Sequence, residues 1–265
     1  MIIDGRTIAK DIYAQTANEV SHLLHAPHMT VFTCAPDFAT QKYLALKKKQ
    51  ACKVGVGVNI IELPDSLTTQ EVVQSVQRAC LQTDAIIVQL PLPEHIDTDI
   101  VLDAIPKKYD VDGMHYDGTA NTFMSPVVAA IAEMAQRHDV LFAGQKVTII
   151  GRGRLVGAPS VLWAQGQGAH VTVLDIDSTE EESSHAVSTA DILILGAGVP
   201  ELITPDMVKD GVVIFDAGAS EDGGELTGDA HVDCAKKASL ITPVPGGIGP
   251  VTIAILLRNV VASIA

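Results

Sequence analysis

One stretch of the sequence, residues 146–175, constrains the fold more than any other. An apolar segment of strand length, 146–150, runs directly into the loop Gly151–Gly157, which has the pattern GxGxxxG, and a second strand-like segment, 171–174, ends in Asp175. Glycines at this spacing let the backbone turn tightly into a helix, whose first amide groups suit a pyrophosphate. The order strand, glycine loop, helix, strand and acid predicts half of a dinucleotide-binding parallel sheet; a tight turn without a ligand is the alternative.

Asp175 and its neighbours bear on which dinucleotide would bind. A carboxylate at the end of the second strand accepts hydrogen bonds from a ribose diol and repels a 2′-phosphate. Asp177 and the run Glu180–Glu182 add negative charge to the same edge. The sequence therefore favours NAD over NADP, unless these acids form a solvated loop that does not reach the ribose.

Hydrophobic periodicity divides the chain into two α/β halves. Strand-like segments alternate with helical patterns at 5–25, 30–34, 39–54, 57–63, 68–81, 84–90 and 99–105, and again at 126–138, 146–150, 157–166, 171–174, 191–195 and 212–216. We expect an α/β fold of two three-layer lobes, an N-terminal catalytic lobe and a Rossmann-type lobe, with a C-terminal helix returning to the first lobe. The predicted domains are 1–120 with 250–265, and 121–249.

Composition excludes several classes of function. The 265 residues carry a net charge of −14, which argues against nucleic acid as a partner. The apolar segments are of strand length, well below the roughly 18 residues of a membrane span, and the N-terminus lacks the pattern of a signal peptide. The four cysteines are scattered without ligand spacing, so we expect no metal site and reduced thiols in a cytoplasmic protein.

Four polar residues in the first half are candidates for chemistry. Tyr43 and Lys47 are one helical turn apart and share a face of the helix at 39–54. Gln89 ends an apolar strand, where a buried amide needs a partner, and Asp112 lies in a Val-Asp-Gly turn. A lysine in a dry cleft has a lowered pKa and can transfer protons. Taken singly, each of these residues is more often a surface contact or a turn residue.

A run rich in proline and glycine, Thr242–Thr252, precedes the last helical pattern. Proline and glycine at this density do not form a helix or a central strand. We predict a shaped loop whose backbone approaches a ligand, with an ordinary strand-to-helix turn as the alternative.

These motifs occur in the same order in one family. The pattern Tyr43-x-x-x-Lys47, the segment VQLPLP at 88–93, the segment DVDG at 110–113, the glycine loop and the segment PVPGGIGPVT at 243–252 resemble the bifunctional methylenetetrahydrofolate dehydrogenase/methenyltetrahydrofolate cyclohydrolase family. The resemblance spans nearly the whole chain, and its second and last motifs are highly specific. It implies oxidation of methylenetetrahydrofolate with NAD or NADP, hydrolysis of the methenyl product, and a homodimer.

The resemblance also implies which residues form the sites. Lys47 would be the central catalytic residue, Tyr43 would position the folate, Gln89 would tune Lys47 and Asp112 would bind the pterin ring. Pro245, Gly246 and Gly247 would shape the folate wall. The cofactor would be bound by Gly151, Arg152, Gly153, Val156, Gly157, Asp175, Ile176 and Ala219. Asp175 and Ile176 stand where the family usually has basic or hydroxyl residues, which again favours NAD.

Two other functions stay open at this point. One is a dehydrogenase that lacks cyclohydrolase activity. The other, from a different class, is a catalytically weak folate- or NAD-binding protein with a regulatory role. Retention of the four polar residues argues against the second.

Overall fold

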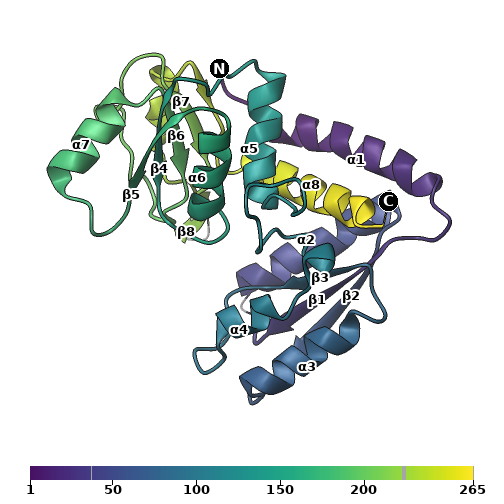
Figure 1. Cartoon of the computed structure of the whole chain (residues 1–265). Coiled ribbons are helices and arrows are strands. Elements are labelled where there is room, and N and C mark those ends of the chain that lie inside the picture. The colour runs from purple at the N-terminus through teal and green to yellow at the C-terminus, as the bar shows by residue number, and fades with distance from the viewer. Residues whose placement is uncertain (37, 223–224, 265) are drawn as a thin grey trace. The chain divides into compact units, whose positions relative to one another are not determined.

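The computed structural model describes residues 1–36, 38–222 and 225–264, and the chain divides into two compact units (Figure 1). Lys10–Pro126 and Ile253–Ala265 form one, which we call the Lys47 unit; Met1–Ala9 and Val127–Thr252 form the other, which we call the Gly151 unit. The predicted division placed all of residues 1–120 in the first domain. Met1–Ala9 group with the Gly151 unit because Ile3 N donates a hydrogen bond to Ile241 O at 3.0 Å, adding a short parallel bridge beside that strand.

The predicted helices and strands are present, with small shifts at their ends. In chain order the first elements are α1 (Gly5–Ser21), β1 (His28–Cys34), α2 (Phe38–Val54), β2 (Gly57–Leu63), α3 (Thr69–Ala79), β3 (Ala85–Val88), α4 (Thr98–Asp103) and the 3-10 helix η1 (Lys107–Tyr109). They are followed by α5 (Pro126–Arg137), β4 (Lys146–Ile150), α6 (Gly157–Gly166), β5 (His170–Leu174), α7 (Glu180–Thr189), β6 (Ile192–Leu195), β7 (Val213–Asp216), β8 (Ser220–Asp222), β9 (Glu225–Thr227), η2 (Val232–Lys236), β10 (Leu240–Ile241) and α8 (Ile248–Ala262).

Helix α7, the antiparallel strand pair β8 and β9, and strand β10 are absent from the sequence prediction. Helix α7 has mostly polar residues and little apolar periodicity, so the pattern on which the prediction depended is missing. Its start is nevertheless encoded locally, because Thr179 and Glu182 form a reciprocal capping box.

The Lys47 unit is a three-layer α/β sandwich. Its parallel sheet has the order β2-β1-β3. One face packs on α1, α2 and α8 through a cluster that includes Val31, Leu44 and Leu256, and the other face packs on α3 and α4 (Figure 1). The C-terminal helix therefore returns to the N-terminal lobe, as predicted.

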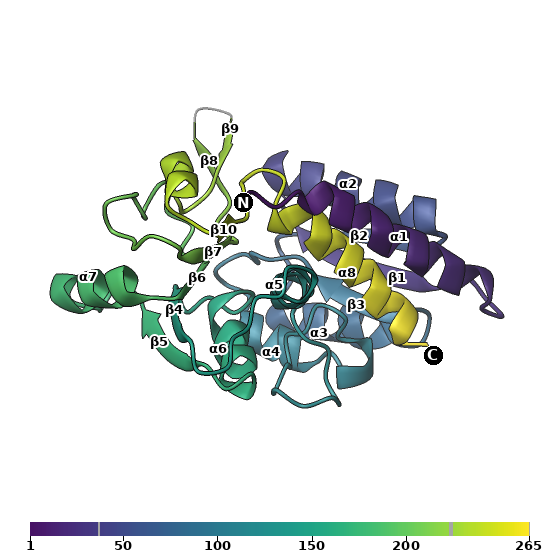
Figure 2. The ribbon, with the colours of Figure 1, turned by 90° about the horizontal axis from the view of Figure 1, so that it is seen from above.

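The Gly151 unit is a doubly wound sheet. Its five parallel strands have the order β10-β7-β6-β4-β5. Helices α6 and α7 lie on opposite faces (Figure 2). On the α6 side, Phe142 packs edge-on against Trp163 with ring centroids 4.6 Å apart and stacks on Phe215. Because parallel strands end at one edge, the loops after β4, β5, β6 and β7 share the carboxyl edge of this sheet. Across the described part of the chain, no helix is long and apolar enough to cross a bilayer.

Candidate active site

The four polar residues proposed from the sequence meet inside the Lys47 unit. Lys47 is only 5% exposed although it carries an ammonium group. Its Nζ atom donates a hydrogen bond to Gln89 Oε1 at 3.0 Å and lies 4.6 Å from the centroid of the Tyr43 ring. A buried lysine with a hydrogen-bond acceptor and an aromatic face beside it is a group whose proton affinity is set by its surroundings.

Gln89 is held so that its oxygen faces Lys47. Its backbone amide donates to Phe32 O at 2.8 Å, directly past the end of β3. Its side-chain Nε2 donates to Leu90 O at 3.1 Å, which leaves Oε1 as the acceptor for Lys47. The amide thus fixes the position of the amine without competing for its proton.

Asp112 is presented by a tightly built turn after η1. The buried Asp110 carboxylate accepts hydrogen bonds from the backbone amides of Met114 and His115, at 3.0 and 2.7 Å, and from His115 Nδ1. From α8, Asn259 donates to Val111 O at 3.0 Å. These contacts fix the backbone on both sides of Asp112.

Burial and charge shift the pKa values of this group in a consistent way. Burial lowers the pKa of the Lys47 ammonium below its ordinary 10.5, and the Asp112 carboxylate acts in the opposite direction. Burial raises the pKa of Asp112, and Lys47 opposes that rise. The pKa of the Tyr43 phenol is raised by burial and then by Asp112. The group therefore contains an amine that is easier to deprotonate than a surface lysine.

The glycine loop of the Gly151 unit is closely packed at two of its glycines and open at the third. A Cβ atom on Gly151 would lie 2.6 Å from Gly196 O, and one on Gly157 would lie 2.0 Å from Gly151 O, so both positions require glycine. A Cβ atom on Gly153 would meet nothing within 4 Å, so the backbone there is open to a ligand. Val156 precedes α6 and makes no side-chain cap. Ala158 N donates to Gly153 O at 3.1 Å and Pro159 has no N–H, so Gly157 N is the first-turn amide left to another acceptor.

A cavity of about 620 Å³ opens beside this loop, at the end of β5. Asp175 lies in its wall, with Oδ1 accepting from Asp177 N at 3.0 Å and from Ser178 Oγ, and with Oδ2 paired to Arg152. The hydrogen bond from Asp177, together with Arg152, holds the pKa of Asp175 below its ordinary value. Asp175 is thus an ionised acceptor at the place where the ribose of a dinucleotide is expected.

The other predicted cofactor contacts lie at the same edge of the sheet but not in the cavity wall. Ile176 directly follows Asp175 and its side chain is fully exposed. Ala219 follows β7 and is exposed.

The proline- and glycine-rich loop is held by the N-terminus. Gly5 N donates to Gly246 O at 3.0 Å, and Gly247 N donates to Pro243 O at 2.7 Å. A Cβ atom on Gly5 would lie 1.8 Å from Gly247 O, and Gly246 has φ +112°. Pro245 is exposed and follows a cis peptide bond. The loop therefore presents a fixed backbone, and its glycines cannot accept side chains without rearrangement.

Sequence reasoning missed several residues that build these sites, namely Gly5, Asp110, His115, Asp216, Asp229 and Asn259. Gly5, Asp216, Asp229 and Asn259 act through contacts with residues distant in the chain, whereas Asp110 and His115 contact each other across five residues of one turn. A local sequence signal exists for Asp216 and Asp229, because each aspartate lies within two residues of a glycine, in the segments 216–218 and 228–229.

Comparison with known proteins gives a consistent result. Two family models match: tetrahydrofolate dehydrogenase/cyclohydrolase, catalytic domain, at residues 3–112, and its NAD(P)-binding domain at residues 125–265. The bifunctional protein FolD of Exiguobacterium sibiricum is 36% identical, covering 98% of each chain.

Solved structures agree with this. The bifunctional FolD methylenetetrahydrofolate dehydrogenase/cyclohydrolase of Campylobacter jejuni has a TM-score of 0.95 at 30% identity and covers 99% of this chain and 98% of its own. The Trypanosoma brucei enzyme, complexed with NADP cofactor and inhibitor, has a TM-score of 0.92 at 30% identity, covering 99% and 96%. By sequence and by structure, over nearly its whole length, the chain belongs to the tetrahydrofolate dehydrogenase/cyclohydrolase family.

Proposed function

We propose that Lys47 is the central catalytic residue of this methylenetetrahydrofolate dehydrogenase and methenyltetrahydrofolate cyclohydrolase, an enzyme of one-carbon folate metabolism. The enzyme oxidises 5,10-methylenetetrahydrofolate to the 5,10-methenyl form and hydrolyses that product to 10-formyltetrahydrofolate. The observation that carries the assignment is the buried Lys47 amine, which is hydrogen-bonded to Gln89 and whose pKa is lowered by burial and raised in part by the charge of Asp112.

The hydrolysis requires proton transfer at the folate bridge carbon. Water adds to the cationic methenyl carbon and loses a proton, which the neutral Lys47 amine accepts. When the carbon–nitrogen bond opens, the Lys47 ammonium returns that proton to the departing nitrogen, and the hydroxyl group loses its proton to solvent as the formyl C=O forms, so one proton is released overall. The lowered pKa of Lys47 enlarges the fraction of free amine near neutral pH, and Gln89 Oε1 keeps the amine oriented.

The oxidation depends on orientation more than on acid–base chemistry. The two nitrogens of the bridge stabilise the cation that forms, and the nicotinamide, when bound, accepts the hydride. We assign Tyr43 and Asp112 to holding the folate, Asp112 through the pterin ring. Pro245, Gly246 and Gly247 stay predicted substrate contacts, and the fixed backbone of their loop supports that prediction.

We assign the cofactor site to the carboxyl edge of the Gly151 unit, with NAD preferred. Support comes from the open backbone at Gly153 and from the charges that line the adjacent cavity, where Asp175, Asp177 and Glu182 occur with one guanidinium, that of Arg152. Three carboxylates against one cation disfavour the additional phosphate of NADP. Asp175→Ser should therefore raise kcat/KM with NADP relative to NAD; an unchanged ratio would remove Asp175 from this role.

One assay separates the three functions left open by the sequence. Purified protein is mixed with methylenetetrahydrofolate and either NAD or NADP, and the absorbance of reduced nicotinamide and of methenyltetrahydrofolate is followed. The bifunctional enzyme gives reduced nicotinamide with only transient methenyl product. Accumulated methenyl product would indicate a dehydrogenase alone, and no reduced nicotinamide with either cofactor would indicate a protein without that activity.

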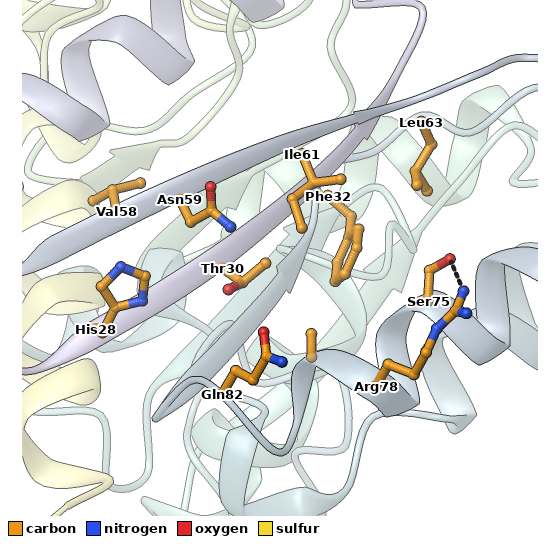
Figure 3. A pocket seen from close by; sticks show the side chains of 11 residues that line it. His28, Thr30, Phe32, Val58, Asn59, Ile61, Leu63, Ser75, Arg78 and Gln82 are labelled. Carbon is orange, nitrogen blue, oxygen red and sulfur yellow. Dashed lines mark hydrogen bonds between the residues drawn. The ribbon is translucent and has the colours of Figure 1, made fainter.

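We also propose that the enzyme is a homodimer that pairs through the edge of the Lys47 unit. Strand β2 lies at the edge of its sheet, and α3 leaves part of β2 uncovered. The resulting groove, of about 630 Å³, runs between the strands and α3, with Phe32 and Ile61 over it and Arg78 at its side (Figure 3). An edge strand next to a partly apolar groove is a ready site for pairing with a second copy of the same strand.

Ile61→Lys tests this interface by placing a charge in the groove. We expect the variant to sediment as a monomer in analytical ultracentrifugation while the wild type sediments as a dimer. Ile100→Lys, at an exposed apolar residue of α4, is the matched control and should leave the dimer intact. A monomeric wild type would refute the proposal.

A cytoplasmic location is the last part of the proposal. Cys34, Cys52, Cys80 and Cys234 are all free thiols in the structure, which suits a reducing compartment. Detection of the protein only in a secreted fraction would contradict this assignment.

A further inference from the structure

The loop that follows β6 binds a buried carboxylate from a distant segment of the chain. Asp229 has no exposed surface, and its Oδ2 atom accepts hydrogen bonds from Ala197 N at 2.7 Å and Gly198 N at 3.2 Å. Its Oδ1 atom accepts from Val199 N at 2.9 Å. Three successive backbone amides that converge on one anion form a nest, which here is filled by the side chain of the protein itself.

The nest lies directly against the phosphate-binding loop. The backbone of Gly196 is so close to Gly151 that a Cβ atom on Gly151 would lie 2.6 Å from Gly196 O. On its other side, a Cβ atom on Gly196 would lie 2.6 Å from Val156 Cγ1. Because Gly196 is packed closely against both Gly151 and Val156, a displacement of Gly196 toward either residue must move it.

Asp229 is itself fixed by a second buried carboxylate. Asp216, at the end of β7, accepts from Asp229 N at 3.2 Å, from Gly218 N at 2.9 Å and from Ala230 N at 2.8 Å. A Cβ atom on Gly218 would lie 2.2 Å from Asp229 Cγ, so the two chain segments are in direct contact. Asp216 and Asp229 together connect the ends of β6 and β7 to the segment 228–230.

We propose that Asp229 is a positioning residue of the cofactor site. It holds the loop 196–199 in the conformation that supports Gly151 and Val156, and so controls the shape of the phosphate-binding loop without touching the cofactor. The proposal rests on the assignment of the cofactor to the Gly151 unit. It predicts that Asp229 affects cofactor affinity and leaves alone the cyclohydrolase step, which uses no cofactor and which we assign to Lys47.

Asp229→Asn is the direct test, because asparagine keeps the size of the side chain but offers a single acceptor oxygen to the three amides. We expect the dissociation constant of NADH, measured by isothermal titration calorimetry, to rise about tenfold. The KM for the oxidised cofactor should rise in parallel, with a smaller change in kcat, while the kcat for methenyltetrahydrofolate hydrolysis stays at the wild-type value. Asp206→Asn, at an exposed carboxylate of the same unit, is the control and should change neither.

A second pair of variants tests the nest without changing the carboxylate. Gly198 has φ +68° and Gly211 has φ +83°, and a Cβ atom would meet nothing within 4 Å at either position. Substitution by alanine therefore imposes a similar backbone strain at both. Gly198 belongs to the nest, whereas Gly211 precedes β7 at the opposite edge of the sheet. Gly198→Ala should weaken NADH binding by about threefold or more, and Gly211→Ala should leave it unchanged.

The outcomes are distinguishable. A folded Asp229→Asn variant with wild-type NADH affinity would overturn the positioning role, and so would equal losses of affinity in the two glycine variants. Parallel loss of hydrolysis and NADH binding would show that Asp229 only maintains the fold. If the wild-type protein itself fails to bind NADH and NADPH, the assignment of the cofactor site is refuted, and the role proposed for Asp229 is refuted as a consequence.

Discussion

Replacement of Lys47 by methionine tests whether Lys47 transfers the proton in methenyltetrahydrofolate hydrolysis. Methionine is similar in length and apolar, so it fills the buried position while removing the amine that hydrogen-bonds Gln89 Oε1. General acid–base catalysis by a positioned side chain contributes about 10²- to 10⁴-fold, or about 3–5 kcal/mol of activation free energy. We expect the kcat of methenyltetrahydrofolate hydrolysis to fall by that factor.

The same substitution should change stability much less than it changes the rate. Loss of the hydrogen bond leaves Gln89 Oε1 without its donor, which costs about 1–3 kcal/mol. Removal of a desolvated ammonium offsets this cost, since apolar replacements of buried charges are often neutral or stabilising. The free energy of unfolding should therefore shift by no more than about 2 kcal/mol, measured by urea denaturation.

The control is the neighbouring residue on the same helix. Lys48→Met removes an equal charge from an exposed position of α2 and should leave the hydrolysis rate unchanged. Hydrolysis is followed by the decay of methenyl absorbance, after correction for the uncatalysed rate in the same buffer. A Lys47→Met enzyme that hydrolyses its substrate within threefold of the wild-type rate would refute Lys47 as the proton-transfer group.

Three further predictions follow from the buried groups. Asp112→Asn removes the carboxylate that stabilises the Lys47 ammonium, so the rise of kcat for hydrolysis with pH, which follows the loss of the Lys47 proton, should move to lower pH; a move to higher pH would contradict the electrostatics. Burial raises the pKa of Asp216 to about 6 from an ordinary 3.8, so the folded state binds the Asp216 proton more tightly than the unfolded state does. Proton binding therefore stabilises the folded state fully below pH 3.8, and this contribution is lost as the pH rises through 6. Between those limits the loss amounts to about 3 kcal/mol, and urea denaturation of Asp216→Asn should show a weaker dependence on pH than the wild type. Gly5→Ala places a Cβ atom 1.8 Å from a backbone oxygen and should destabilise the fold by about 1–3 kcal/mol, whereas Gly249→Ala, with open space around it, should not lower the melting temperature.

Much of the fold is encoded in short segments and could be predicted from them. Apolar runs bounded by turns gave the strands, and helical periodicity gave α1, α2, α3 and α8. Short-range motifs also identified the Lys47 group, because Tyr43 and Lys47 are related by one helical turn. That Gln89 and Asp112 would join them followed from the family resemblance, and the structure supplies the hydrogen bond and the charge that connect them.

The sequence by itself determined the two α/β lobes, the glycine loop with its acid, and the placement of Tyr43 and Lys47 on one helix face, because local patterns of polarity, glycine and proline are enough to specify them. Only the tertiary structure decided that Met1–Ala9 pair with the Gly151 unit, that Gly5 holds the loop at Gly246, and that Asp229 fills a nest some 30 residues away in the chain. The physical reason is common to all three. Buried backbone amides and carbonyls must find partners, and which distant segment supplies the partner depends on how the sheet edges and loops come together, a relation that periodicity along the chain does not record.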